Sequence, residues 1–170
     1  MTNRSSLVGN TLLLEEIIEC SKETSFEPDA IHLPKDNRAP ESPNPACVVC
    51  GQENPRGLHL QFAAKSNAAV AQWIASDGWE SFRGVIHGGV ICAVLDEAMS
   101  QAILSAGYSA LTAEIRVRFR NKVSVNDDLC VRGWVVSVRK RKIVAESSLT
   151  SVDGVEMAHA YATFLTARRS

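Results

Sequence analysis

The chain contains 170 residues, of which 45% are hydrophobic and 22% are charged. This length and composition are typical of one soluble domain with a well-packed core. The formal net charge is −1. The overall charge therefore provides no attraction to nucleic acid or to an anionic membrane, and we expect neither as a partner.

A membrane span or a secretory signal is not expected. No stretch approaches the ~20 consecutive apolar residues that cross a bilayer. The apolar run at residues 12–14 is followed at once by Glu15 and Glu16, so it is too short for the apolar region of a signal sequence. We therefore expect a cytoplasmic protein.

The first 46 residues differ in pattern from the rest of the chain. Residues 10–22 carry leucine and isoleucine at helical spacing, and residues 28–45 contain five prolines with little apolar periodicity. The sequence thus predicts an N-terminal helix and proline-rich extension at residues 1–46, followed by a compact domain at residues 47–170.

Hydrophobic periodicity predicts one long helix between two groups of strands. Residues 58–62 and 70–75 are expected to form two strands joined by a turn, with a loop at residues 79–84. Residues 88–105 contain no proline and keep a broad apolar pattern at helical spacing. Four further strands are expected at residues 112–119, 129–138, 143–151 and 155–165. The pattern predicts an α+β fold in which an antiparallel sheet, ending in a four-strand meander, wraps around one helix.

Asp96 is the unusual residue of the predicted helix, because the residues one and two turns away from it are apolar or small. These neighbours are Gly89, Cys92, Met99 and Ile103. Burial of an unpaired carboxylate raises its pKa or costs several kcal/mol, so we expect Asp96 either to have a partner or to be used in chemistry. Glu97 has small or polar neighbours and is expected at a solvent-facing or rim position.

Gly88 and Gly89 form the expected start of this helix. Backbone N–H groups at a helix start lack intrahelical acceptors and lie at the positive end of the helix dipole, so they can hold an oxyanion or a polarised carbonyl. Such a donor together with a carboxylate is the minimum set for thioester hydrolysis. Taken alone, His87-Gly88-Gly89 is more often a tight turn at a helix start.

Residues 87–98 read His-Gly-Gly-Val-Ile-Cys-Ala-Val-Leu-Asp-Glu-Ala. This segment resembles the H-G-G-x(6)-D-x-A signature of hotdog thioesterases of the phenylacetate-degradation (PaaI-like) group, and the similarity covers about residues 47–167. The resemblance implies a hotdog fold and an acyl-CoA thioesterase that needs no cofactor, since coenzyme A is part of the substrate. It also implies a homodimer or a tetramer built as a dimer of dimers, with the active site between subunits.

The resemblance assigns a role to each position of the motif. Asp96 matches the helix carboxylate that acts as general base or nucleophile. The backbone N–H of Gly88, with Gly89 beside it, matches the donor that polarises the thioester carbonyl. His87 matches the motif histidine, and we expect it to position the loop and the helix rather than to act as a base.

Two further positions are candidates for the same site. Thr112 falls where some relatives place a Ser or Thr from the partner subunit, although a strand threonine with a local hydrogen bond is an equal alternative. Ser81 stands where several relatives carry Asn or Gln, and it is shorter than either. This departure leaves the rate and the substrate preference open, more than the reaction class.

Coenzyme A phosphates could be bound by a basic hairpin turn, since family members often use basic residues there or nearby. The turn consists of Arg139, Lys140, Arg141 and Lys142. The alternative is a solvated turn, which is the commoner role of a charge run. Three arginines that alternate with apolar residues on an earlier strand are secondary candidates: Arg116, Arg118 and Arg120.

No metal site is expected, because Cys47-x-x-Cys50 lacks the second pair of ligands that a structural zinc site needs. The segment from Cys47 to Leu58 also looks like an opening segment of some family members, which favours a structural role for the two cysteines.

The function expected from these features is the hydrolysis of an acyl- or aroyl-CoA thioester. Two alternatives stay open. An enoyl-thioester hydratase or dehydratase would use the same fold with a different histidine pattern. A non-catalytic acyl-CoA binding module would gain little from a carboxylate on an apolar helix stripe.

Overall fold

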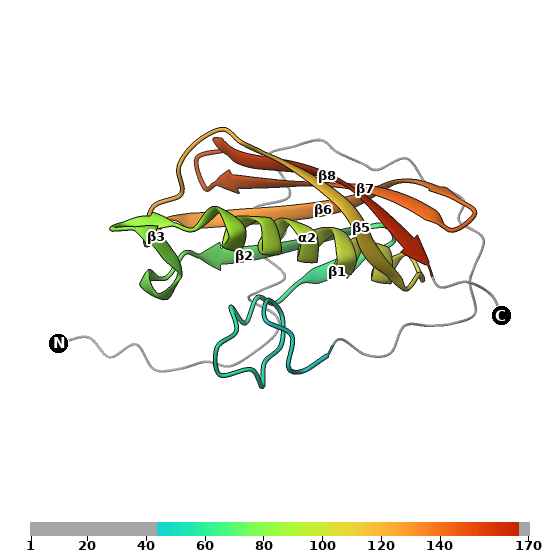
Figure 1. The fold of residues 1–170 in the computed structure, drawn as a ribbon, viewed down its shortest axis with the longest axis horizontal. Helices are drawn as coiled ribbons and strands as arrows, with labels where there is room; N and C mark the ends of the chain where they lie inside the picture. The colour runs from blue at the N-terminus through green and yellow to red at the C-terminus, as the bar shows by residue number, and fades with distance from the viewer. Residues whose placement is uncertain (1–43, 167–170) are drawn as a thin grey trace.

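One long helix lies against an antiparallel sheet of six strands (Figure 1). The structure is a computed structural model that describes residues 44–166. The helix is α2, Gly88–Ser105, which has the predicted boundaries. The strands are β1 Ala63–Lys65, β2 Ala68–Ile74, β5 Ala110–Phe119, β6 Asp128–Arg139, β7 Lys142–Ser151 and β8 Glu156–Thr166. This confirms the predicted α+β arrangement of one helix and an antiparallel sheet.

The strand order is β1-β2-β6-β7-β8-β5, so the predicted four-strand meander is wrong in one respect. Strand β5 pairs with β8 rather than with β6, and β2 pairs with β6. Strands β6, β7 and β8 do follow one another as hairpins. The strand that leaves the helix therefore crosses to the far edge of the sheet.

Two segments before the helix differ from the prediction. Residues 58–62 form no strand, because His59 has a φ of 54° and its ring contacts the Gly51 carbonyl at 3.0 Å; the first strand begins at Ala63. The predicted loop at 79–84 contains a short hairpin of β3, Glu80–Phe82, and β4, Val85–Ile86. It follows a short 3₁₀ helix, Asp77–Trp79. The helix predicted at residues 10–22 lies outside the described residues.

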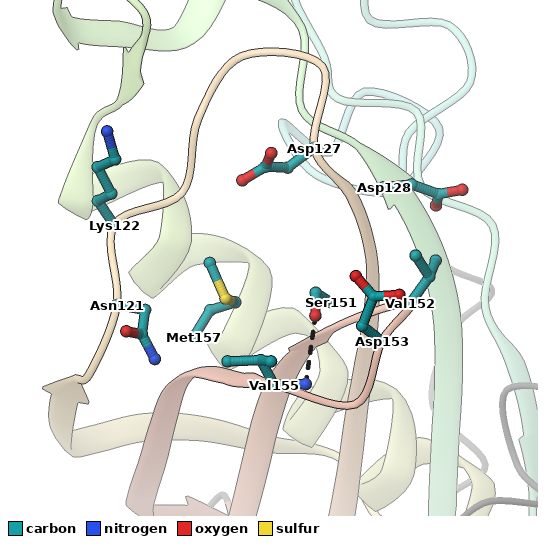
Figure 2. A pocket seen from close by; sticks show the side chains of 9 residues that line it. All are labelled: Asn121, Lys122, Asp127, Asp128, Ser151, Val152, Asp153, Val155 and Met157. Atoms are coloured by element: carbon teal, nitrogen blue, oxygen red, sulfur yellow. Dashed lines mark hydrogen bonds between the residues drawn. The ribbon is translucent and has the colours of Figure 1, made fainter.

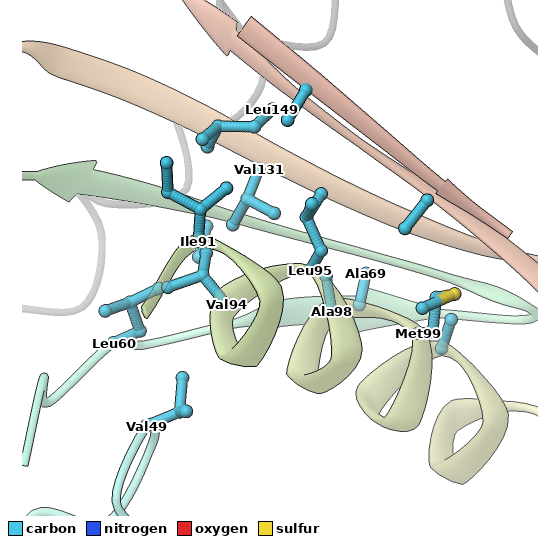
Figure 3. Packing of buried hydrophobic residues seen from close by; sticks show 14 of the residues in the cluster. Val49, Leu60, Ala69, Ile91, Val94, Leu95, Ala98, Met99, Val131 and Leu149 are labelled. Atoms are coloured by element: carbon cyan, nitrogen blue, oxygen red, sulfur yellow. The ribbon is translucent and has the colours of Figure 1, made fainter. Parts of the chain in front are cut away.

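The core lies between α2 and the sheet (Figure 3). The helix buries Ile91, Val94, Leu95, Ala98, Met99, Ala102 and Ile103. A fully buried leucine stabilises a fold by about 1.5–3 kcal/mol, so this stripe is a main source of stability. By length and composition α2 also meets the requirements for a membrane span. Its buried face nevertheless packs on the sheet, as expected for the core helix of a globular domain.

Gly133 on β6 lets the sheet approach the helix backbone. A Cβ atom at position 133 would lie 2.2 Å from the Ala98 carbonyl oxygen. Any side chain there would push the strand away from α2, so only glycine fits this contact. The contact sets the depth of the helix in the sheet.

Candidate active site

His87 caps the start of α2 with its own side chain. It has an extended backbone, with φ −65° and ψ 130°, and its Nδ1 accepts a hydrogen bond from the Gly89 N–H at 2.8 Å. The His87 N–H donates to the Trp79 carbonyl at 2.8 Å, which ties the helix start to the preceding turn. With Nδ1 used as an acceptor, the His87 side chain serves as the N-cap of α2.

The N–H of Gly88 has no hydrogen-bond acceptor among residues 44–166. The Phe119 ring covers one side of this residue, since a Cβ at position 88 would lie 3.3 Å from Phe119 Cζ. A Cβ at position 89 would lie 3.0 Å from His87 Nδ1. The free N–H at the positive end of the helix dipole is therefore a ready donor for a polarised carbonyl oxygen.

Asp96 is half-buried on the face of α2 that looks toward β5. Its Oδ1 accepts a hydrogen bond from the Thr112 hydroxyl at 2.8 Å. Burial raises the pKa of Asp96 above its ordinary value, and the negative charge of Glu97 adds to this rise, while the Thr112 hydrogen bond opposes it. A carboxylate whose pKa is raised in this way is a stronger base than an ordinary aspartate.

Cys92 lies one turn before Asp96 on the same helix and is half-buried. Burial raises the pKa of its thiol, and the Asp96 charge raises it further. Cys92 therefore remains a neutral thiol, and it adds an apolar wall beside the carboxylate.

Gly88 and Asp96 of one chain lie too far apart to act on one carbonyl group. They are eight positions apart on a continuous helix, which corresponds to ~12 Å along its axis at 1.5 Å per residue. A carbonyl oxygen bound by the N–H of Gly88 lies about 3 Å from that nitrogen, and a bridging water adds about 3 Å more. The two groups of a single chain therefore do not form a complete site.

Ser81 and the basic turn lie at opposite ends of the domain. Ser81 is exposed on β3, and its hydroxyl donates to the Val85 carbonyl at 3.4 Å, beside the helix start. The turn between β6 and β7 lies beside Thr166, whose carbonyl accepts from Arg141 Nη2 at 2.8 Å. Thr166 pairs with Ala110, just beyond the C-terminal end of α2 (Figure 1). The structure thus separates the basic turn from Gly88 of the same chain.

The arginines of β5 face away from the helix. Arg116 and Arg118 pair with Tyr161 and His159, which are partly exposed on the outer face of the sheet, while the alternate residues of β8 are buried. Glu114 accepts from Arg116 at 2.7 Å. This placement weakens the arginines as candidates for contact with a coenzyme A bound beside Asp96.

A surface pocket lies elsewhere, between the connection from β5 to β6 and the turn from β7 to β8 (Figure 2). Its walls include three carboxylates and one cation: Asp127, Asp128, Asp153 and Lys122. Its lining contains neither Asp96 nor Gly88. It is therefore separate from the motif residues.

Glu97 faces the loop that precedes β1 rather than open solvent, so of the two expected positions the solvent-facing one is wrong. It is half-buried beneath the loop that precedes β1, where its Oε2 accepts from the Cys47 thiol at 3.6 Å. Its Oε1 accepts from Gln101 Nε2 at 2.7 Å. Sequence reasoning missed this cluster, because residues fifty positions apart are brought together only by the fold.

The region that contains the His-Gly-Gly motif is similar to known proteins. The thioesterase superfamily is matched over residues 83–158. No curated protein sequence matches the chain significantly. Many solved structures share the fold at low sequence identity.

Two of these structures contain coenzyme A or acetyl-CoA, and a third comes from an operon for phenylacetic acid degradation. A hypothetical thioesterase from Streptococcus pneumoniae TIGR4, solved with coenzyme A, is 18% identical, with a TM-score of 0.61 over 65% of this chain and 88% of its own. A Streptococcus mutans UA159 protein bound to acetyl-CoA is 19% identical, with a TM-score of 0.62 over 65% and 90%. The Escherichia coli PaaI protein from the phenylacetic acid degradation operon is 17% identical, with a TM-score of 0.61 over 64% and 83%.

The family match confirms the resemblance to the thioesterase superfamily over residues 83–158, and the solved structures share the fold. The helix start, Asp96 and strands β5, β6 and β7 fall inside the matched range, which ends within β8. Residues 83–158 thus match the thioesterase superfamily, and the chain has the hotdog fold.

Proposed function

We propose that the protein is an acyl-CoA thioesterase, which hydrolyses an acyl- or aroyl-CoA thioester to the free acid and coenzyme A. The observation that carries this proposal is the half-buried Asp96 carboxylate, which accepts a hydrogen bond from Thr112. Asp96 lies on the helix that begins with the free Gly88 N–H. Family membership supports a thioester hydrolase. The coenzyme A bound to the streptococcal relatives supports the choice of thiol.

The active site is formed by two subunits. Because ~12 Å separates Gly88 from Asp96 along one helix, the carbonyl is polarised by the Gly88 N–H of one chain and attacked near Asp96 of the other. Strand β5 is the last strand of its sheet, and no other strand of residues 44–166 pairs with its outer edge. A second copy of the chain can therefore pair there. Leu111 on this strand is 81% exposed, which fits a surface that becomes covered.

The chemistry needs only these groups. Asp96 takes a proton from a water molecule while the water oxygen attacks the carbonyl carbon, and the N–H of Gly88 stabilises the resulting oxyanion. When the oxyanion collapses, the carbon–sulfur bond breaks, and the proton held by Asp96 passes to the leaving thiolate. Thr112 keeps the carboxylate oriented throughout.

The direct test is release of free thiol from a panel of short, long and aromatic acyl-CoAs. Asp96→Asn is expected to lower the rate at least ~100-fold, as for loss of a positioned base. Asp153→Asn, in the exposed turn between β7 and β8, is the matched control and should keep the full rate. If Asp96→Asn hydrolyses every substrate as fast as the wild type, the role of Asp96 is wrong.

A second experiment tests the two-subunit site. Gly88→Pro removes the N–H at the first position of a helix, where proline is tolerated, and the extended His87 backbone suits a following proline. Gly88→Ala keeps the N–H and is the control for the added Cβ beside Phe119. Gly88→Pro and Asp96→Asn should each be inactive alone.

When the two inactive variants are mixed and refolded together, half of the dimers contain one chain of each kind. A mixed dimer then has one intact site, so about a quarter of the wild-type activity should return. A site contained within one chain would give no recovery, because every chain in the mixture carries one defect. That outcome would reject the shared site while leaving the hydrolase reaction intact.

A further inference from the structure

Two thiols and a carboxylate meet on the side of α2 beneath the loop that precedes β1. The loop is residues 44–60, and the groups are those of Cys47, Cys50 and Glu97. One ligand atom from each of the three residues lies within 4.8 Å of the other two. All three residues are half-buried, and no other histidine, cysteine or acidic residue of the described chain joins this group.

The loop is shaped to hold both thiols at this place. Gly51 closes a tight turn, since a Cβ there would lie 2.3 Å from the Cys47 nitrogen. The Val49 N–H points at Cys47 Sγ over 3.4 Å, and the buried Val49 side chain anchors the turn in the core.

The cluster is poorly satisfied without a cation. Glu97 is half-buried and accepts from a thiol, which is a weak donor, and from the Gln101 amide. A divalent cation would accept a lone pair from each of the three side chains at once, so the carboxylate would gain a strong partner in place of a weak thiol donor.

We infer that Cys47, Cys50 and Glu97 bind a zinc ion, which fastens the loop at residues 44–60 to α2. Two thiolates and one carboxylate suit zinc better than magnesium or calcium, which prefer oxygen ligands alone. Tetrahedral zinc with ordinary bond lengths places a sulfur and an oxygen ligand about 3.5 Å apart. The distance of 3.6 Å between Cys47 Sγ and Glu97 Oε2 is already close to this value.

Gln101 is placed to complete the coordination. Its side-chain nitrogen lies 3.7 Å from Cys50 Sγ and 2.7 Å from Glu97 Oε1. Rotation of the amide by half a turn would present the oxygen instead, since the two atoms occupy equivalent positions. Zinc binding displaces one proton from each thiol, and the bound ion replaces the hydrogen bonds that Glu97 now accepts.

This site revises the sequence expectation that the lone Cys-x-x-Cys pair binds no metal. The missing ligand comes from the helix, where Glu97 follows the proposed catalytic Asp96. The inference is independent of the hydrolase reaction, because it depends only on the contacts of the loop with the helix.

The test uses the full-length protein, stripped with a chelator under reducing conditions and then titrated with zinc or cobalt. About one zinc per chain should bind, and cobalt should give the thiolate-to-metal charge-transfer band of a sulfur-ligated tetrahedral site. The melting temperature should rise with bound zinc. Absence of both the bound zinc and the cobalt band would overturn the inference.

Three variants assign the ligands. Cys50→Ser and Glu97→Gln should each lower zinc affinity at least about tenfold, whereas Cys92→Ser, at a half-buried thiol on the same helix, should bind zinc like the wild type. Circular dichroism of each variant establishes that it is folded before titration. Wild-type affinity in folded Glu97→Gln would overturn the proposed ligand set, as would an equal loss in Cys92→Ser.

Discussion

Thr112 donates its hydroxyl hydrogen to Asp96 Oδ1 over 2.8 Å, which joins the start of strand β5 to the middle of α2. The hydrogen bond stabilises the ionised carboxylate against the burial that raises its pKa. The two residues therefore act together, and the threonine sets the pH range in which Asp96 can accept a proton.

Thr112→Val should move the acidic limb of the pH profile of kcat/KM to higher pH. Removal of the hydroxyl leaves burial and the Glu97 charge unopposed, so the pKa of Asp96 rises further and more of the carboxyl is protonated at a given pH. Activity is lost as pH falls through this raised pKa, because only the ionised form is a base. Thr112→Ser keeps a hydroxyl and should retain the wild-type limb. An unchanged limb in Thr112→Val would show that the contact has no influence on the base.

His87→Ala should destabilise the protein by about 1 kcal/mol, because the Gly89 N–H loses its capping acceptor. His87→Asn supplies another capping side chain and should recover most of this loss. Urea denaturation followed by circular dichroism measures both free energies of unfolding. Equal losses in the two variants would mean that the histidine stabilises the helix start by other contacts.

Gly133→Ala should destabilise the fold by several kcal/mol or prevent its expression in soluble form. The new Cβ would collide with the Ala98 carbonyl oxygen, and backbone on both sides of the contact leaves no flexible group to move. Gly78→Ala is the matched control, since no atom lies within 4 Å of a Cβ built there. Near-wild-type stability of Gly133→Ala would show that helix and sheet can separate at small cost.

Lys140→Asn tests the basic turn as a phosphate contact. The substitution removes one charge, and asparagine tolerates the φ of 54° at this position better than most residues. The KM for acyl-CoA should rise about twofold to fivefold, in line with the loss of one exposed charge interaction. The KM for a simple thioester of N-acetylcysteamine, which carries no phosphate, should stay constant. An unchanged KM for acyl-CoA would indicate a solvated turn.

The boundaries of α2 could be predicted because local features define both ends. His87 and the two glycines mark its start, and Gly107 follows its end with a φ of 85°. The long strands after the helix were predicted for a similar reason, since turn residues separate alternating segments. Each of these signals is contained in a few neighbouring residues.

Features set by distant residues could not be predicted. The pairing of β5 with β8 depends on the closing of the whole sheet, and the alternating pattern of residues 58–62 was overridden by the left-handed His59. Asp96 could be singled out because its apolar helix neighbours are local. Its hydrogen bond with Thr112 and the group around Glu97 depend on long-range contacts. Sequence reasoning therefore located the motif and missed part of its surroundings.

The close contact at Gly133 also bears on how the molecule tolerates change. Since main-chain atoms of β6 and α2 meet there with no side chain between them, the spacing of the two elements is a property of the backbone. Conservative substitutions of core side chains such as Leu95 or Met99 should change the melting temperature but not the distance between α2 and the sheet. The position of the Asp96 carboxylate should therefore change little when core side chains are substituted.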